Sequence, residues 1–267
     1  WGSADTVHLM VEAERRAYAD RAKYLGDPDF YAVPVETLIK KSYAKSRFAA
    51  VYLEQASNSN EIYPGKMPFT EGAETTHFSV MDKTGLMVAL TTTLNSSYGN
   101  KIVVPGTGML LNNEMDDFSS KPNTENQFRL LGGDANSIAP YKRMLSSMTP
   151  TIITKDEEPF LITGTPGGST IITTVLQIIL NVIDHQMEIE DAVSFPRFHH
   201  QWKPDQVMFE PFAFSPDTIK MLKARGHRNL IETDWGRGIG DANSIMFRDS
   251  VMLGVKDPRT EGMAVGF

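Results

Sequence analysis

The chain has 267 residues, enough for one large or two small domains, and 41% of them are hydrophobic, which excludes an intrinsically disordered protein. Its formal net charge of −7 argues against a nucleic-acid-binding protein. The absence of cysteine excludes disulfides, thiolate chemistry and sulfur-ligated metal sites. The longest apolar run, at 171–183, is interrupted by threonine and amide side chains, so it predicts a buried helix and not a membrane span.

The first 53 residues predict two helices. Val7, Met10, Val11 and Tyr18 recur at helical spacing, which predicts a helix from Ala4 to about Tyr24. Proline at a first helical position predicts a second helix over about 34–53. The chain opens in mid-pattern, so we expect its first residue to be an internal boundary of a longer protein.

A polar linker follows, and then strands alternate with helices. The composition of 57–74 is typical of an exposed connector without secondary structure. Ser169 is expected to cap a helix that ends near residue 185, and further helices are expected at 189–194 and 216–225. The predicted strands are 77–82, 86–93, 108–113, 151–155, 159–163, 206–210, 244–248 and 251–255. Runs of strands followed by runs of helices indicate an α+β fold.

A threonine marks the junction between the linker and the first predicted strand. If the chain were cut between Glu74 and Thr75, the freed α-amine of Thr75 would become the base that activates its own hydroxyl as a nucleophile. An ordinary threonine at the start of a strand is the alternative, and the position alone does not decide between them.

Several sequence blocks resemble the γ-glutamyltranspeptidase family, and they occur in the family's order. The first is Thr-Thr-His-Phe-Ser-Val at 75–80, which resembles the start of that family's small subunit. The others lie at 24–30, 93–99, 110–118, 145–151, 163–169, 195–202 and 257–259. The resemblance implies the four-layer αββα sandwich of N-terminal-nucleophile hydrolases, incomplete in this chain. It also implies that 1–74 is the end of a large subunit and that 75–267 is the small-subunit catalytic region.

The resemblance assigns the reacting groups. It implies that Thr75 is the nucleophile after autocleavage and that Thr93 orients it. It implies that Gly167 and Gly168 form an oxyanion hole, where backbone N–H groups approach a tetrahedral intermediate closely. Read without the resemblance, Thr93 is a strand former, and the two glycines form a strand-to-helix turn or a phosphate cradle. No lysine of the Walker pattern follows them, which disfavours the phosphate cradle.

The resemblance also implies a pocket for a γ-glutamyl group. Glu114 and Asp117 would bind the substrate ammonium, since a buried cation needs carboxylate partners. Ser146 and Ser147 would donate hydrogen bonds to its α-carboxylate, and Asn95 would complete the pocket. Without the resemblance, Glu114 and Asp117 could also be a metal or acid–base pair.

The activity implied is γ-glutamyl transfer or hydrolysis of glutathione and related amides, with an amino acid, dipeptide or water as acceptor. No metal or organic cofactor is implied, and the large subunit of the same precursor would be the protein partner. A periplasmic or secreted location is expected for the full-length protein. Two alternatives stay open: an acylase of the same fold acting on glutaryl-type amides or poly-γ-glutamate, and an uncleaved, inactive fragment. His77, His199 and His200 are interpreted as structural residues.

Overall fold

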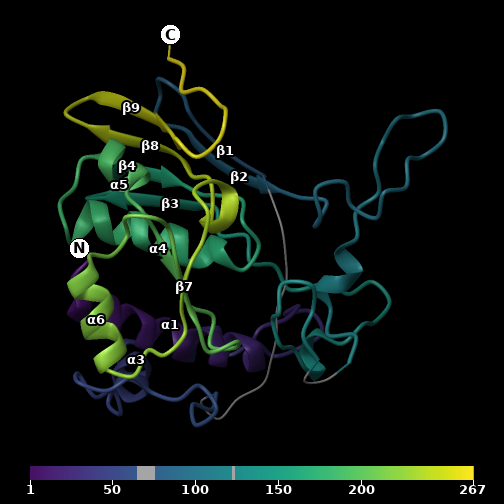
Figure 1. Cartoon of the computed structure of the whole chain (residues 1–267). Coiled ribbons are helices and arrows are strands. Elements are labelled where there is room, and N and C mark those ends of the chain that lie inside the picture. Colours follow the sequence, from purple (N-terminus) through teal and green to yellow (C-terminus); the bar gives the residue numbers. More distant parts are fainter. Residues whose placement is uncertain (65–75, 122–123, 267) are drawn as a thin grey trace. The chain divides into compact units, whose positions relative to one another are not determined.

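The computed structural model describes residues 1–64, 76–121 and 124–266 (Figure 1). These residues form two compact units, which are described separately. Unit 1 consists of 1–73, 114–146 and 199–232, and unit 2 consists of 74–113, 147–198 and 233–267. Each unit is assembled from three separate stretches of sequence. The predicted division of the chain into 1–74 and 75–267 is a cleavage position and not a boundary between packed units, and it stays a prediction.

Unit 1 is built around one long helix. The helix α1 (Ala4–Tyr24) has the predicted bounds, and the side chain of Ser3 caps it by accepting a hydrogen bond from the Thr6 N–H. The other helical elements of unit 1 are α2 (Val35–Leu38), α3 (Lys41–Phe48), η1 (Glu114–Asp117), η2 (Asp134–Asn136) and α6 (Pro216–Ala224). The strands β6 (Val207–Phe209) and β7 (Leu230–Glu232) pair in parallel, and β5 (Phe198–His199) pairs with β6.

The single helix predicted over 34–53 is wrong. The structure has two short helices there, α2 and α3, and neither contains a buried residue. A helix this short is not stable in water unless it buries an apolar face, so nothing holds the two segments in one continuous helix.

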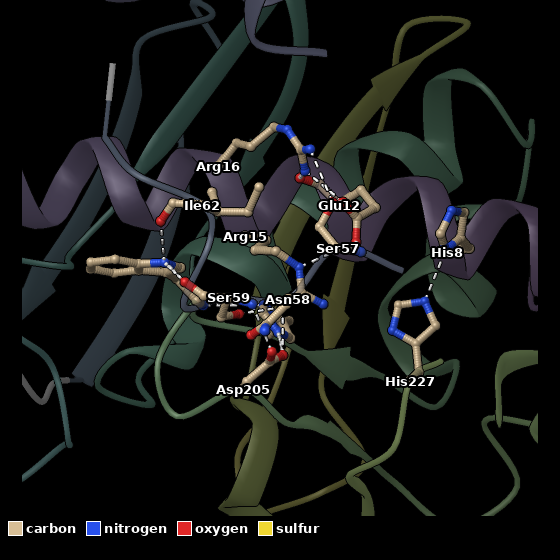
Figure 2. A network of polar contacts seen from close by, with 12 residues as sticks. His8, Glu12, Arg15, Arg16, Ser57, Asn58, Ser59, Ile62, Asp205 and His227 are labelled. Carbon is tan, nitrogen blue, oxygen red and sulfur yellow. Dashed lines mark hydrogen bonds and ion pairs between the residues drawn. The ribbon is translucent and has the colours of Figure 1, made fainter. Parts of the chain in front are cut away.

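Buried charged residues fix α1 to distant segments of unit 1 (Figure 2). Arg15 forms ion pairs with Glu12, at 3.2 Å, and with Asp205, at 2.5 Å. Glu12 accepts hydrogen bonds from the N–H and hydroxyl of Ser57, and Asp205 accepts one from the Ser59 N–H. The beginning of the predicted linker is therefore held to unit 1 by hydrogen bonds. The predicted exposure of this linker is wrong at Ser59, which is buried. The rest of the linker, 65–74, lies outside the described residues.

Unit 2 contains an antiparallel sheet covered by helices. The sheet has the order β3-β4-β8-β9, with β3 (Thr151–Lys155), β4 (Glu158–Thr163), β8 (Asn243–Arg248) and β9 (Val251–Lys256). The helices are α4 (Thr170–Ile183), α5 (Ile189–Ser194) and the short η3 (Arg237–Ile239). The core between sheet and helices consists of Leu161, Ile178, Val182, Ile189, Ala192, Val193, Ala242 and Met246.

A β-hairpin adds a further layer to unit 2. The strands β1 (Thr76–Met81) and β2 (Met87–Thr92) pair with each other, and they lie close to β3, β4 and β8 (Figure 1). Leu161 of β4 faces the helices, so its neighbour Ile162 faces the opposite side, and Ile162 is buried as well. Unit 2 by itself therefore has helices, a sheet and a hairpin, consistent with a mixed α and β fold.

The remaining differences from the sequence predictions are local. The strand predicted at 108–113 is wrong, because only an isolated bridge joins Val103 to Leu110 and both Met109 and Leu111 are exposed. Ser169 precedes α4 but makes no capping bond with its side chain. The two-residue β5 and three-residue β7 were too short for a periodic pattern. None of the described helices combines the length and apolar character needed to cross a bilayer.

Stability is expected to fall as the pH drops below about 6.5, because four buried histidines stay neutral in the folded protein. Burial lowers the pKa of His77, His199 and His200 to about 4, and that of His227 to about 3. The unfolded chain titrates its histidines near 6.5, so between about pH 6.5 and pH 4 it binds more protons than the folded chain. Each histidine should then cost on the order of 1–2 kcal/mol at about pH 5.

Urea unfolding at about pH 5 and about pH 7 checks this expectation. Replacing His199 with glutamine should reduce the pH dependence, because one titrating group is removed. Equal unfolding free energies at the two pH values would show that these histidines gain protons as readily in the folded state.

Candidate active site

A glycine turn connects β4 to α4 in unit 2. Gly167 has φ of 136° and Gly168 has φ of 59°, both in the region that favours glycine. The carbonyl of Gly167 accepts hydrogen bonds from the N–H and the hydroxyl of Thr170. Among the described residues, neither glycine N–H is used in a hydrogen bond. The turn therefore presents backbone donors beside the N-terminus of a 14-residue helix, where negative charge is stabilised.

A cavity of about 540 Å³ lies in unit 1, and a larger one of about 790 Å³ lies in unit 2. The larger cavity joins the glycine turn to the start of β1 and the end of β2. Its lining residues are Thr76, Thr92, Thr93, Leu94, Asn95, Ser96, Ser97, Pro166, Gly167, Gly238 and Asp241. Three predicted site residues, Thr93, Asn95 and Gly167, thus lie around one cavity. Thr75 precedes Thr76 in the sequence and lies outside the described residues.

Thr93 and Asn95 form a tight turn on the wall of this cavity. The hydroxyl oxygen of Thr93 accepts a hydrogen bond from the Asn95 N–H at 2.8 Å, so its proton is available to donate to another group. Asn95 is buried and has a positive φ of 72°. Its side-chain amide donates to the carbonyl of Asn113, and the Asn113 side chain accepts from the Ser96 N–H. Asn113 therefore holds Asn95 in place, a role that the sequence analysis missed.

The acidic pair and Ser146 belong to unit 1. Glu114 and Asp117 are the first and last residues of η1, and burial raises the pKa of Glu114. Asp117 is buried. The side chain of Asn136 donates to the carbonyl of Asp117 and accepts from the Leu145 N–H, so it holds η1 beside the segment that leads to Ser146. Ser147, which belongs to unit 2, is fully buried.

Asn136 and Asp241 were both missed by the sequence analysis. Each lies in a copy of the hexapeptide Gly-Asp-Ala-Asn-Ser-Ile, at 133–138 and at 240–245. The first copy forms η2, whereas the second leads into β8, so the two copies do not share a structure. Asp241 lines the larger cavity, and its carboxylate accepts a hydrogen bond from the Thr260 hydroxyl. The repeat therefore looks like chance, and it did not indicate the contacts of Asn136 or Asp241.

The histidine pair belongs to unit 1, where the hydrogen bonds described for it join it to an amide and a carboxylate. His199 and His200 are buried, and their ring nitrogens bond Gln201 and Asp205 respectively. Within residues 1–64, 76–121 and 124–266, no group of three or more acidic or histidine side chains is arranged to hold a metal ion.

Comparison with known proteins places the whole chain in one group. It is 50% identical over 261 residues to the glutathione hydrolase proenzyme of Escherichia coli (strain K12), covering 97% of this chain and 44% of that protein. The γ-glutamyltranspeptidase of Pseudomonas nitroreducens complexed with L-DON matches with a TM-score of 0.68 and 44% identity, over 72% of this chain and all of the solved chain. A cephalosporin acylase from Bacillus halodurans matches with a TM-score of 0.83 and 29% identity, over 98% of this chain and 45% of that chain.

These neighbours define the class as the N-terminal-nucleophile hydrolases, and they confirm the predicted fold class. The family model for gamma-glutamyltranspeptidase matches residues 1–267. The chain therefore belongs to the γ-glutamyltranspeptidase family, a family of enzymes, as the sequence blocks indicated. It spans about 44% of the length of the Escherichia coli relative that it matches.

Proposed function

We propose that this chain is the C-terminal part of a γ-glutamyltransferase and glutathione hydrolase precursor that cleaves itself before Thr75. The observation that carries the proposal is the larger cavity of unit 2, where Thr76, Thr93, Asn95 and Gly167 lie together. Thr76, the residue that follows the proposed nucleophile in the sequence, lines this cavity. Gly167 also lines this cavity, and among the described residues the N–H groups of the glycine turn are not used in a hydrogen bond.

The reaction follows from these groups. The Thr75 hydroxyl attacks the carbonyl of Glu74, and the Glu74–Thr75 C–N bond breaks, which frees the Thr75 α-amine and leaves Glu74 as an ester on the Thr75 oxygen. Water then hydrolyses this ester, which releases the Glu74 carboxylate and the Thr75 hydroxyl. This amine has an ordinary pKa of about 8 and takes the hydroxyl proton when Thr75 attacks a γ-glutamyl amide. The N–H groups of Gly167 and Gly168 stabilise the oxyanion, and the leaving amine accepts the proton. Water or an acceptor amine then attacks the γ-glutamyl ester and regenerates the free threonine.

The length of a solved relative supports the cleavage position. The whole separate chain of the Pseudomonas nitroreducens enzyme matches 72% of this chain. Residues 75–267 make up the same share of the sequence. We infer that the large-subunit residues of the precursor are its protein partner. The family resemblance implies that they supply an arginine for the substrate α-carboxylate and that the complete protein is periplasmic or secreted.

Intact-mass spectrometry with N-terminal sequencing tests the proposal. The expected result is a fragment that begins at Thr75, together with release of the aniline from a γ-glutamyl anilide. The variant Thr75→Ala should yield neither the fragment nor the aniline. A wild-type precursor that remains a single chain, with no release of aniline, would refute the proposal.

An acylase is the second candidate, because the cephalosporin acylase matches nearly the whole chain with a TM-score of 0.83. The two activities differ in the substrate ammonium, which a γ-glutamyl group has and a glutaryl group lacks. Only the γ-glutamyl activity requires Glu114 and Asp117 to pair with a buried cation.

Replacing Asp117 with alanine is expected to separate the two activities. Loss of a buried partner for a charged group costs about 2 kcal/mol or more, so kcat/KM for the γ-glutamyl anilide should fall at least about thirtyfold. Turnover of a glutaryl anilide should change little. Asp116→Ala is the matched control in the same turn, because Asp116 instead accepts a hydrogen bond from the Gln127 N–H. Equal losses on both substrates would show that Asp117 supports the pocket and does not bind the substrate ammonium.

A further inference from the structure

His77 lies at the second position of β1 in unit 2 and connects this strand to its surroundings. Its side chain is buried, although the strand alternates with exposed residues on either side. Its Nδ1 lies 2.8 Å from the hydroxyl of Thr91 on β2, and its Nε2 lies 3.0 Å from the hydroxyl of Ser79 on β1. Both ring nitrogens are therefore used in hydrogen bonds.

The single proton of the Ser79 hydroxyl determines which groups donate and which accept in the two hydrogen bonds of His77. The hydroxyl of Ser79 donates to the carbonyl of Asn243 on β8, at 3.0 Å. A serine hydroxyl has a single proton, so toward His77 it accepts, and Nε2 of His77 must carry hydrogen. Nδ1 then accepts the proton of the Thr91 hydroxyl. Burial lowers the pKa of His77 to about 4, so the imidazole is neutral at neutral pH.

Gly164 provides the space that the imidazole occupies. A Cβ atom at this position would lie between 2.3 and 2.7 Å from three ring atoms of His77, which is too close for any side chain. The Asn243 N–H donates to the carbonyl of Gly164. The strand β8, whose Asn243 carbonyl accepts the hydrogen bond of Ser79, is therefore also bonded to Gly164. The imidazole therefore packs against the end of β4, three residues before Gly167.

We propose that His77 is a positioning residue, and that the hydrogen-bond chain from Thr91 through His77 and Ser79 to Asn243 fixes the start of β1 relative to the glycine turn. This inference rests on the proposed function, since the position of β1 matters to the reaction only if the residue before Thr76 is the nucleophile. His77 does not act as a base, because the lone pair of Nδ1 is already used. Its role is to hold the two walls of the larger cavity at a fixed separation.

The protonation state of the ring tests the hydrogen-bond chain without any assay of activity. Nitrogen-15 NMR of histidine-labelled protein at neutral pH should show Nε2 of His77 protonated and Nδ1 unprotonated. Either an Nδ1–H form or a doubly protonated ring would overturn the inference, because neither fits the direction of the chain.

Variants that keep the volume but remove one bond test the effect on the reaction. Thr91→Val removes the donor to Nδ1, and it should slow both formation of the Thr75 fragment and kcat for a γ-glutamyl anilide. The expected loss is about tenfold to a hundredfold at unchanged KM, since misplacement by about 1 Å has effects of this size. Thr154→Val, at an exposed position of β3, is the matched control and should change neither rate.

Two replacements of His77 separate positioning from folding. Gln places an N–H near the site of Nε2, so His77→Gln should retain more activity than His77→Leu at the same folded fraction. The inference is wrong if Thr91→Val and His77→Leu both react at the wild-type rate. A wild-type precursor that never cleaves would refute the proposed function and the positioning role with it, whereas the NMR result would still describe the hydrogen bonds.

Discussion

Replacing Asp257 with alanine is expected to lower the free energy of unfolding by about 3–5 kcal/mol, because it leaves two buried arginines without a counter-charge. Asp257 is fully buried in unit 2. Its carboxylate pairs with Arg197 at 2.5 Å and with Arg259 at 2.9 Å, and the side chains of these arginines are 3% and 0% exposed. Burial by itself raises the pKa of Asp257, but the two guanidinium groups outweigh this effect and hold the pKa below its usual value.

The same carboxylate also supports the wall of the larger cavity. Asp257 accepts a hydrogen bond from the Ala242 N–H at 2.7 Å, and Arg197 donates to the carbonyl of Ile239. Ile239 and Ala242 lie on either side of Asp241 in the sequence, and Asp241 lines the cavity. We therefore expect the variant to lose activity as well as stability, even at temperatures where it remains folded.

Urea unfolding of three variants tests this expectation. Asp257→Asn keeps the shape of the side chain and removes its charge, so it should be destabilised nearly as much as the alanine variant. Glu188→Ala is the matched control, because Glu188 pairs with Arg248 by two hydrogen bonds on the surface. Exposed pairs contribute little to stability, so the control should unfold close to wild type. A small effect of both Asp257 variants would show that water reaches the two arginines.

The sequence predicted those elements whose pattern is local and regular. The helix α1 has the apolar spacing of a buried helix, and β3 and β4 are short runs with several β-branched residues on either side of a turn, so their bounds were close to the structure. Segment 108–113 looked like a strand by composition, but no neighbouring strand pairs with it, and pairing is a property of the whole fold. The helix predicted over 34–53 failed for a related reason, since no apolar face of α2 or α3 is buried.

The candidate site was predicted by resemblance, and its supporting contacts were not. Thr93 and Asn95 were named from one block and Gly167 from another, and the structure places all three around one cavity. Asn136 bonds Asp117, 19 residues away, and Asp257 pairs with Arg197, 60 residues away, so no local pattern indicates these two contacts. Buried polar residues of this kind are recognised only when their partners are known, because their composition resembles that of exposed turns.

Replacing Gly167 with alanine is expected to reduce kcat by roughly a hundredfold to a thousandfold, the effect of losing one oxyanion-hole donor. At this residue a Cβ atom would lie 2.6 Å from the hydroxyl of Thr170 and 3.2 Å from Cα of Gly240. The turn would have to move, and its N–H groups would move away from the position of the oxyanion. KM should change less than kcat, because these donors stabilise the transition state more than the bound substrate.

Gly236→Ala is the control that separates this displacement from backbone strain. Gly236 has φ of 138°, nearly the same as Gly167, but among the described residues, apart from its own chain neighbours, no atom lies within 4 Å of the site of its Cβ. Alanine there carries a backbone strain of about 1–3 kcal/mol without crowding a neighbour. We expect Gly167→Ala to lose at least as much stability as Gly236→Ala in thermal unfolding, and only Gly167→Ala to lose activity with a γ-glutamyl anilide. Equal losses of kcat in the two variants would mean that strain, and not the position of the N–H donors, limits the reaction.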